Sequence, residues 1–141
     1  MRFWDPSAIV PLLVEEARSG EMRALIAADP GMVTWWGAAV ECVGAAARLR
    51  REEVLTMAEE EAVLGRLDEL ADGWAEVLPS AQVRSGARRL LRLHVLRAAD
   101  ALQLAAARVW AGPTIHAEFV TFDERLALAA RMEGFRVLPQ A

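Results

Sequence analysis

Short segments rich in aromatic and β-branched residues alternate with longer segments rich in alanine and leucine along the whole chain. The short segments predict strands at residues 3–4, 32–36, 74–78, 117–121 and 135–138. The longer segments predict helices at residues 8–14, 20–28, 38–51, 57–70, 81–93, 96–110 and 124–133. Because strands and helices alternate, we expect one parallel sheet with helices on both faces, that is, a single α/β domain over residues 1–141.

Composition limits the class of protein. Of the 141 residues, 55% are apolar and 26% charged, which is typical of a globular domain. No apolar run reaches the ~20 residues that span a bilayer, and the chain begins without the basic start of a signal peptide, so we expect a cytoplasmic protein with no membrane contact. The single cysteine, Cys42, fits a reducing compartment. A net charge of −4 argues against coating nucleic acid by bulk charge, but not against a nuclease whose acids are offset by metal ions.

An acid follows the first predicted strand directly. Asp5 comes after Phe3 and Trp4 and is followed by Pro6 and Ser7. Proline is well tolerated at the start of a helix, and either Ser7 or Asp5 itself can cap one, so a helix is predicted to begin here. Asp5 would then lie at the carboxyl end of a strand, where open α/β sheets bind their ligands.

Three further acids stand apart from the charged runs of a solvated surface. Glu41 lies among small and apolar residues of the helix predicted at 38–51. Asp100 has similar neighbours in the helix predicted at 96–110, and Asp123 directly follows the fourth predicted strand. Taken singly, each has an ordinary explanation: Asp100 and Asp123 can cap helices, and Glu41 can pair with Arg48 or another arginine.

Together the four acids indicate a cation site, because all can reach the same edge of the sheet. Two carboxylates ~4 Å apart repel by about 4 kcal/mol at an effective dielectric constant of ~20. Such a cluster is stabilised by protonation or by a bound cation. Oxygen ligands without histidine or cysteine favour Mg²⁺ or Mn²⁺. His94, His116 and Cys42 lie apart from one another in the sequence and are interpreted as ordinary residues.

The chain resembles PIN-domain ribonucleases, and most closely the VapC-type toxins of bacterial toxin–antitoxin pairs. The resemblance covers essentially the whole chain and is concentrated in residues 3–8, 40–41, 97–105, 120–127 and 130–138. It implies a central parallel sheet of strand order 3-2-1-4-5. It also implies that Asp5, Glu41, Asp100 and Asp123 form the family's acidic quartet around one or two divalent ions, with Ser7 and Thr121 as supporting hydroxyls. Gln103 departs from the pattern, because many members have histidine there.

The function expected from this resemblance is Mg²⁺-dependent (or Mn²⁺-dependent) hydrolysis of RNA by a toxin that forms a homodimer and binds a small antitoxin protein. The apolar helices before Gly73 are candidates for these protein contacts. The alternative is a PIN-fold protein that cleaves weakly or not at all and acts by binding its antitoxin or RNA. The lack of any lysine argues against a receiver domain, which needs a pair of adjacent acids early in the chain and a lysine late in it.

Arginines precede the third acid. We expect a basic surface that follows an RNA backbone, or alternatively a solvated face paired with nearby acids. Arg97 is the strongest candidate because it is nearest to Asp100 in the sequence. The remaining members of this cluster are Arg84, Arg88, Arg89 and Arg92.

Overall fold

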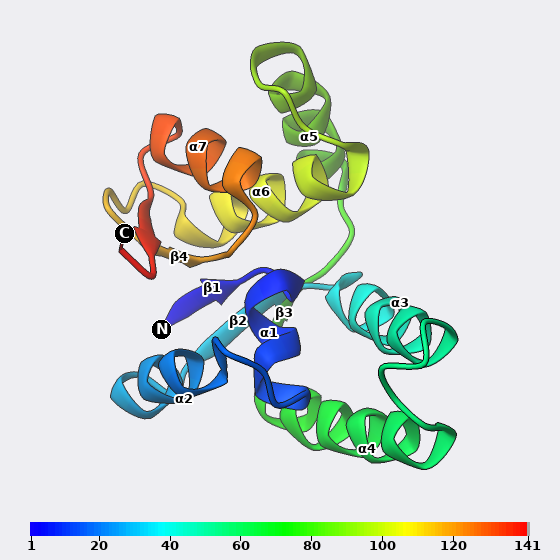
Figure 1. Ribbon diagram of the computed structural model, residues 1–141. Coiled ribbons are helices and arrows are strands. Elements are labelled where there is room, and N and C mark those ends of the chain that lie inside the picture. Colours follow the sequence, from blue (N-terminus) through cyan, green and yellow to red (C-terminus); the bar gives the residue numbers. More distant parts are fainter. Residues whose placement is uncertain (141) are drawn as a thin grey trace.

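The predicted sheet is confirmed by the computed structural model, which describes residues 1–140. Five parallel strands are arranged in the order β3-β2-β1-β4-β5 (Figure 1). They are β1 (Arg2–Trp4), β2 (Met32–Trp35), β3 (Ala75–Val77), β4 (Glu118–Val120) and β5 (Arg136–Leu138). The central strand, β1, therefore lies between β2 and β4. The chain adds β2 and β3 on one side of β1 and then β4 and β5 on the other.

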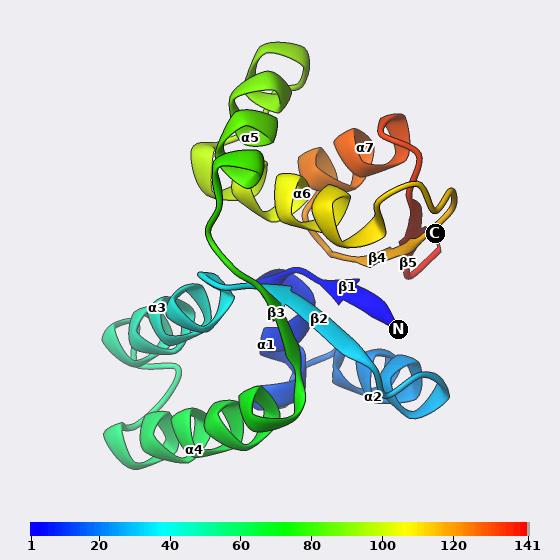
Figure 2. The same ribbon diagram turned by 180° about the vertical axis from the view of Figure 1, so that it is seen from behind.

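Helices cover both faces of the sheet, as the alternation predicts (Figures 1 and 2). One layer contains α1 (Pro6–Leu13), α2 (Ser19–Ala28), α3 (Ala38–Arg51) and α4 (Met57–Gly73). The other contains α5 (Ala81–Leu93), α6 (Ala98–Ala111) and α7 (Glu124–Met132). Within residues 1–140, no helix is long and apolar enough to cross a bilayer.

Each face of the sheet has its own apolar core, because successive residues of a strand point to opposite sides. Phe3 of β1 belongs to the core under α5–α7, where its ring stacks on Phe119 with centroids 5.3 Å apart. Trp4, the next residue, belongs to the core under α1–α4 together with Ile9 and Met22. All five of these side chains are fully buried. The β1 strand is thus fixed from both sides, and so is the residue that follows it.

Helix boundaries follow local sequence signals closely. The predicted ranges 38–51 and 81–93 match α3 and α5, and α4 begins with a capping box formed by Thr56 and Glu59. Gly134, predicted to end the last helix, has a φ of +94°, which favours glycine. The choice of cap at the first helix is settled for Asp5, whose carboxylate accepts the backbone N–H of Ser7.

Candidate functional site

All four predicted acids lie where the strands end at the carboxyl edge of the sheet. Asp5 directly follows β1, and Asp123 follows β4, the neighbouring parallel strand. Glu41 and Asp100 lie in the first turns of α3 and α6. The two helices belong to opposite layers, so the acids come from both sides of the sheet.

Asp5 is the most enclosed of the four, with 4% of its surface exposed. Its Oδ2 accepts hydrogen bonds from the Ser7 N–H at 3.2 Å, the Ser7 hydroxyl at 2.5 Å and the Thr121 hydroxyl at 3.0 Å. Burial raises the pKa of Asp5 to about 7, although these hydrogen bonds oppose the rise. Asp5 is therefore a carboxyl group poised between its neutral and charged forms near neutral pH.

The two supporting hydroxyls join the turns that follow β1 and β4. Ser7 Oγ accepts the N–H of Phe122 at 2.9 Å and lies 3.2 Å from Thr121 Oγ1. Thr121 Oγ1 also accepts the N–H of Asp123 at 3.0 Å. Both hydroxyls thus fix the position of Asp5 relative to the loop that presents Asp123.

Asp123 and Asp100 form the second part of the site. Asp123 caps α7, since its Oδ1 accepts the N–H of Leu126 at 2.9 Å. Asp100 is half-buried and does not occupy the cap position of α6, which belongs to Arg97. Burial and the negative charge of Asp123 both raise the pKa of Asp100, and the backbone and charge of Arg97 oppose the rise. The cap explanation therefore applies to Asp123 and not to Asp100.

Glu41 is half-buried and bound by a residue that the sequence pattern did not single out as functional. Gln103 Nε2 donates to Glu41 Oε2 at 2.5 Å, and within residues 1–140 no arginine forms an ion pair with Glu41. Burial raises the pKa of Glu41, the Gln103 hydrogen bond lowers it, and the charge of Asp100 raises it further. The proposed pairing with Arg48 is thus not observed.

The four carboxylates form a row of electrostatic neighbours. The charge of Glu41 raises the pKa of Asp5, that of Asp100 raises the pKa of Glu41, and that of Asp123 raises the pKa of Asp100. In the part of the chain that the structure describes, no three of them converge into a ready-made cation site. Three of the four carboxylates are instead engaged by donors of their own, namely Asp5, Glu41 and Asp123.

The donor set fits a hard divalent cation. Every candidate ligand is a carboxylate oxygen, and three of the four carboxyl groups have raised pKa values because of burial and neighbouring negative charge. A cation held among them would reduce that repulsion and offset the cost of burial. Zinc is disfavoured because His94 contacts Glu133 instead, and Cys42 is buried with its pKa raised to about 12 by burial.

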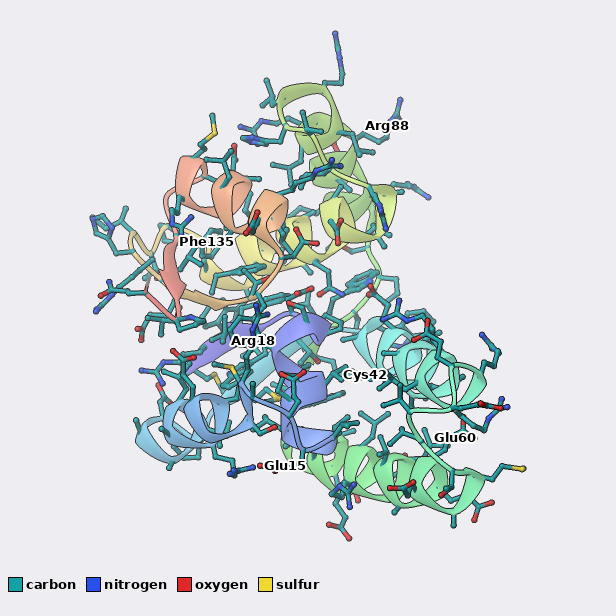
Figure 3. All side chains as sticks on the ribbon, viewed as in Figure 1. Glu15, Arg18, Cys42, Glu60, Arg88 and Phe135 are labelled. Carbon is teal, nitrogen blue, oxygen red and sulfur yellow. The ribbon has the colours of Figure 1, made fainter. Side chains whose placement is uncertain are left out.

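The predicted arginine surface divides into paired and unpaired members. Arg89 pairs with Glu133 at 3.0 Å, so the ordinary interpretation holds for that residue. Arg88 is exposed and projects outward from α5, away from the sheet (Figure 3). Arg97 is exposed at the start of α6, three residues before Asp100.

Arg18 is a basic residue at the site edge that sequence reasoning missed. Its guanidinium lies 4.2 Å from the ring centroid of Phe122, the residue between Thr121 and Asp123, and the side chain lies beside α1 in Figure 3. No sequence signal marks this arginine, because the contact joins segments more than a hundred residues apart. For Gln103 there is a faint signal, since it is the one uncharged polar residue of α6, an otherwise mainly apolar helix.

Known proteins resemble this chain in sequence and in fold. No protein-family model matches the chain. Two ribonucleases of Mycobacterium tuberculosis, VapC45 (strain CDC 1551 / Oshkosh) and VapC49 (strain ATCC 25618 / H37Rv), are each 32% identical over 140 residues, covering 97% of this chain and 94% of the relative.

Two solved structures share the fold. One is the crystal structure of M. tuberculosis VapC20, a toxin that cleaves the sarcin–ricin loop, with a TM-score of 0.70 and 20% identity over 96% of this chain and 97% of the other. The second is PAE2754 from Pyrobaculum aerophilum, with a TM-score of 0.66 and 18% identity over 97% of this chain and 88% of the other.

Proposed function

Because the chain belongs to the VapC family of PIN-domain ribonucleases, we propose that it is a metal-dependent endoribonuclease and the toxin of a toxin–antitoxin pair. The observation that carries the metal-dependent step is the row of four carboxylates at the carboxyl edge of the sheet, in which neighbouring negative charge helps to raise the pKa values of Asp5, Glu41 and Asp100. An acidic row of this kind is costly without a cation.

Asp5, Asp100 and Asp123 would hold Mg²⁺ or Mn²⁺, with Glu41 as the fourth ligand. When bound, such an ion lowers the pKa of a bound water and stabilises charge on a scissile phosphate. All three hydrogen bonds that the Asp5 carboxylate accepts end on Oδ2. Ser7 and Thr121 therefore orient the carboxylate while leaving Oδ1 available to a cation.

Proton release from Asp5 is a part of the mechanism that this chain's own residues determine. Since burial raises the pKa of Asp5 to about 7, the group holds a proton for part of the time near neutral pH. Only the charged form is a good ligand, so cation binding is coupled to loss of that proton. The Ser7 and Thr121 hydroxyls favour the charged form because both donate to it.

The substrate is RNA, and exposed arginines at the site edge are the groups proposed to contact its phosphates. Arg97 lies beside Asp100, and Arg18 lies over Phe122 beside Asp123. Arg88 and Arg92 on α5 are secondary candidates, since both are exposed and Arg88 points away from the sheet. An RNA target and a single free cysteine, Cys42, support the proposal that the protein acts in the cytoplasm.

Protein partners are proposed on the layer of α1–α4. The exposed apolar residues Trp36, Val40 and Val43 precede or lie on α3, with Trp36 53% exposed. Val54 and Met57, also exposed, lie in the α3–α4 connection and at the start of α4. Exposed aromatic and aliphatic side chains of this kind are typical anchors of protein interfaces, which supports a homodimer and an antitoxin bound to this layer.

The proposal is tested with the purified protein and an Asp5→Asn variant on structured and single-stranded RNA, in Mg²⁺ and in EDTA. We expect cleavage by the natural protein in Mg²⁺ only, and a loss of about a thousandfold in the variant. Cleavage that persists in EDTA, or equal cleavage by the variant, would overturn the metal-nuclease mechanism. RNA or antitoxin binding without any cleavage would favour a protein that acts by binding alone.

A further inference from the structure

Gln103 is a fully buried amide in the middle of α6, with 0% of its surface exposed. Burying an amide is unfavourable unless its polar atoms find partners. The Nε2 group donates to Glu41, but Oε1 is buried and has no hydrogen-bond partner in the described chain. An apolar side chain at this position would avoid that cost, so the amide calls for an explanation.

We propose that Gln103 is a positioning residue that holds Glu41 of α3 in the acidic row and thereby strengthens cation binding. The inference rests on the proposed function, because it assumes that the acidic row binds a cation. It goes beyond that function by assigning a role to a residue that is itself no ligand.

The bond joins two helices that otherwise belong to different layers. α3 packs mainly against α4 and α1, whereas α6 packs mainly against α5 and the sheet. Within residues 1–140, the Gln103–Glu41 contact is the only hydrogen bond between α3 and α6. The Glu41 side chain has no other hydrogen bond or ion pair there, so without Gln103 it is free to rotate toward solvent.

The orientation of the amide supports the same role. If the amide were turned over, Oε1 would face the Glu41 carboxylate and the two acceptors would repel each other. The observed orientation satisfies Glu41 and leaves Oε1 unpartnered. The cost of the unsatisfied Oε1 is thus accepted so that Nε2 can donate to this carboxylate. A hydrogen bond to a charged acceptor is one of the stronger kinds.

The first test is a Gln103→Met variant, which keeps a long side chain and removes the amide. We expect Mn²⁺ binding, measured by titration calorimetry, to weaken about tenfold, and the unfolding temperature in EDTA to change little. The matched control is Thr34→Val, since Thr34 Oγ1 is also buried without a hydrogen-bond partner among residues 1–140 and lies on β2, outside the acidic row. This control should bind Mn²⁺ as the natural protein does.

A second test needs no substitution at Gln103. The chain contains three glutamines and no asparagine, so its nitrogen-15 NMR spectrum holds three side-chain amide pairs. Gln82 and Gln140 are exposed, and the buried pair of Gln103 is recognised by slow exchange with solvent. We expect that pair to shift in metal-free Glu41→Ala, and to move saturably when Mg²⁺ is added to the natural protein, while the other two pairs stay in place.

The outcomes separate this inference from the proposed function. If the natural protein binds Mn²⁺ but Gln103→Met binds it equally well, or the Gln103 pair is unmoved by Glu41→Ala or by Mg²⁺, the positioning role is overturned and the metal site stands. A parallel loss of binding in Thr34→Val would also overturn it, because the effect would then be one of general core packing. If the natural protein binds no Mn²⁺, the proposed metal site fails and the positioning role fails with it.

Discussion

Asp5 and Glu41 are neighbours in the acidic row, yet the chain fixes them in opposite ways. Asp5 follows the central strand and accepts two of its three hydrogen bonds from Ser7, two residues away. Glu41 is held by a single side chain that lies 62 residues further along the chain, on a helix of the other layer. The position of Asp5 is therefore set by local structure, whereas that of Glu41 depends on how two layers pack.

This difference has an energetic counterpart. Asp5 is buried, and burial raises its pKa to about 7. Its charged form is therefore unfavourable without a cation, and a bound cation would offset that cost. Glu41 is only half-buried. Burial raises its pKa, and a single amide, that of Gln103, opposes the rise. We therefore expect Asp5 to dominate cation binding and Glu41 to adjust it.

The largest expected effect comes from substituting these two acids in parallel. Asp5→Asn should reduce RNA cleavage by about a thousandfold, since the proposed central ligand of the cation would be lost and with it several kcal/mol of charge stabilisation. Glu41→Gln should reduce it by only about thirtyfold, which is within the range for groups that support a metal site. Cleavage rates in saturating Mg²⁺ measure both, with circular dichroism as the control for folding. Equal losses would remove the distinction between the two acids.

A second prediction concerns pH and the stability of the metal-free protein. Because the pKa of Asp5 is raised to about 7 in the folded protein from 3.8, the folded form keeps a proton that the unfolded form has released. The stability that this proton provides is present below about pH 4 and is lost as the pH rises to 7. Asp5→Asn has no such loss.

The measurement is the free energy of unfolding in urea with EDTA. From pH 5 to pH 8, the value for Asp5→Asn should rise relative to that of the natural protein by roughly 2 kcal/mol, since each unit of pKa shift corresponds to about 1.4 kcal/mol. Glu41→Gln, the control, should gain less because Glu41 is more exposed. A gain that is the same for both variants, or a loss for Asp5→Asn, would contradict the assigned burial of Asp5.

The same contrast explains what the sequence could and could not predict. The strand-ending positions of Asp5 and Asp123 follow from local patterns of apolar residues, and the boundaries of α3 and α5 follow from equally local signals. The strand order needed the family resemblance, because five short strands can be arranged in many ways. The helix caps of Asp5 and Asp123, proposed as ordinary alternatives to a ligand role, are present, so a single carboxylate can serve the local fold and remain available to the site.

Long-range side-chain contacts lay beyond sequence reasoning. The Gln103–Glu41 bond depends on the rotation of α6 above the sheet edge, which no local pattern determines. The pairing of Arg89 with Glu133 similarly joins α5 to the end of α7, and it withdraws one arginine from the predicted RNA surface. Contacts of this kind follow from packing between layers, whereas the elements themselves follow from propensity and periodicity.

A third prediction separates the hydroxyl support of Asp5 from the acid itself. Thr121→Val removes one donor to Asp5 Oδ2 and keeps the shape of the side chain. The pKa of Asp5 should rise further, and cleavage at pH 7 should fall by about tenfold. Because the acid is still present, raising the pH to 9 should restore most of the activity, as measured by a pH–rate profile. Thr34→Val is the control, and a loss that persists at pH 9 would argue against a role through the Asp5 charge.

The smallest expected effect concerns two sides of the acidic row, since each side has an arginine that forms no ion pair within residues 1–140. Arg18 lies over Phe122 on the side of Asp5 and Asp123, and Arg97 begins α6 on the side of Asp100. If RNA follows the whole row, both Arg18→Gln and Arg97→Gln should raise KM about threefold with little change in kcat. Each should also lower the slope of affinity against salt by about 0.7, as expected for one lost contact to a single-stranded phosphate.

Arg23→Gln is the matched control, because Arg23 is exposed on α2, the helix that begins directly after Arg18, but already pairs with Glu15 at 2.7 Å. Its KM should stay unchanged. An effect at Arg97 alone would mean that RNA approaches from α6, so that Glu41 and Asp100 face the phosphate before Asp5 does. An effect at Arg18 alone would place the RNA over the turns joined by Ser7 and Thr121, and Asp5 would then be central to both cation and substrate.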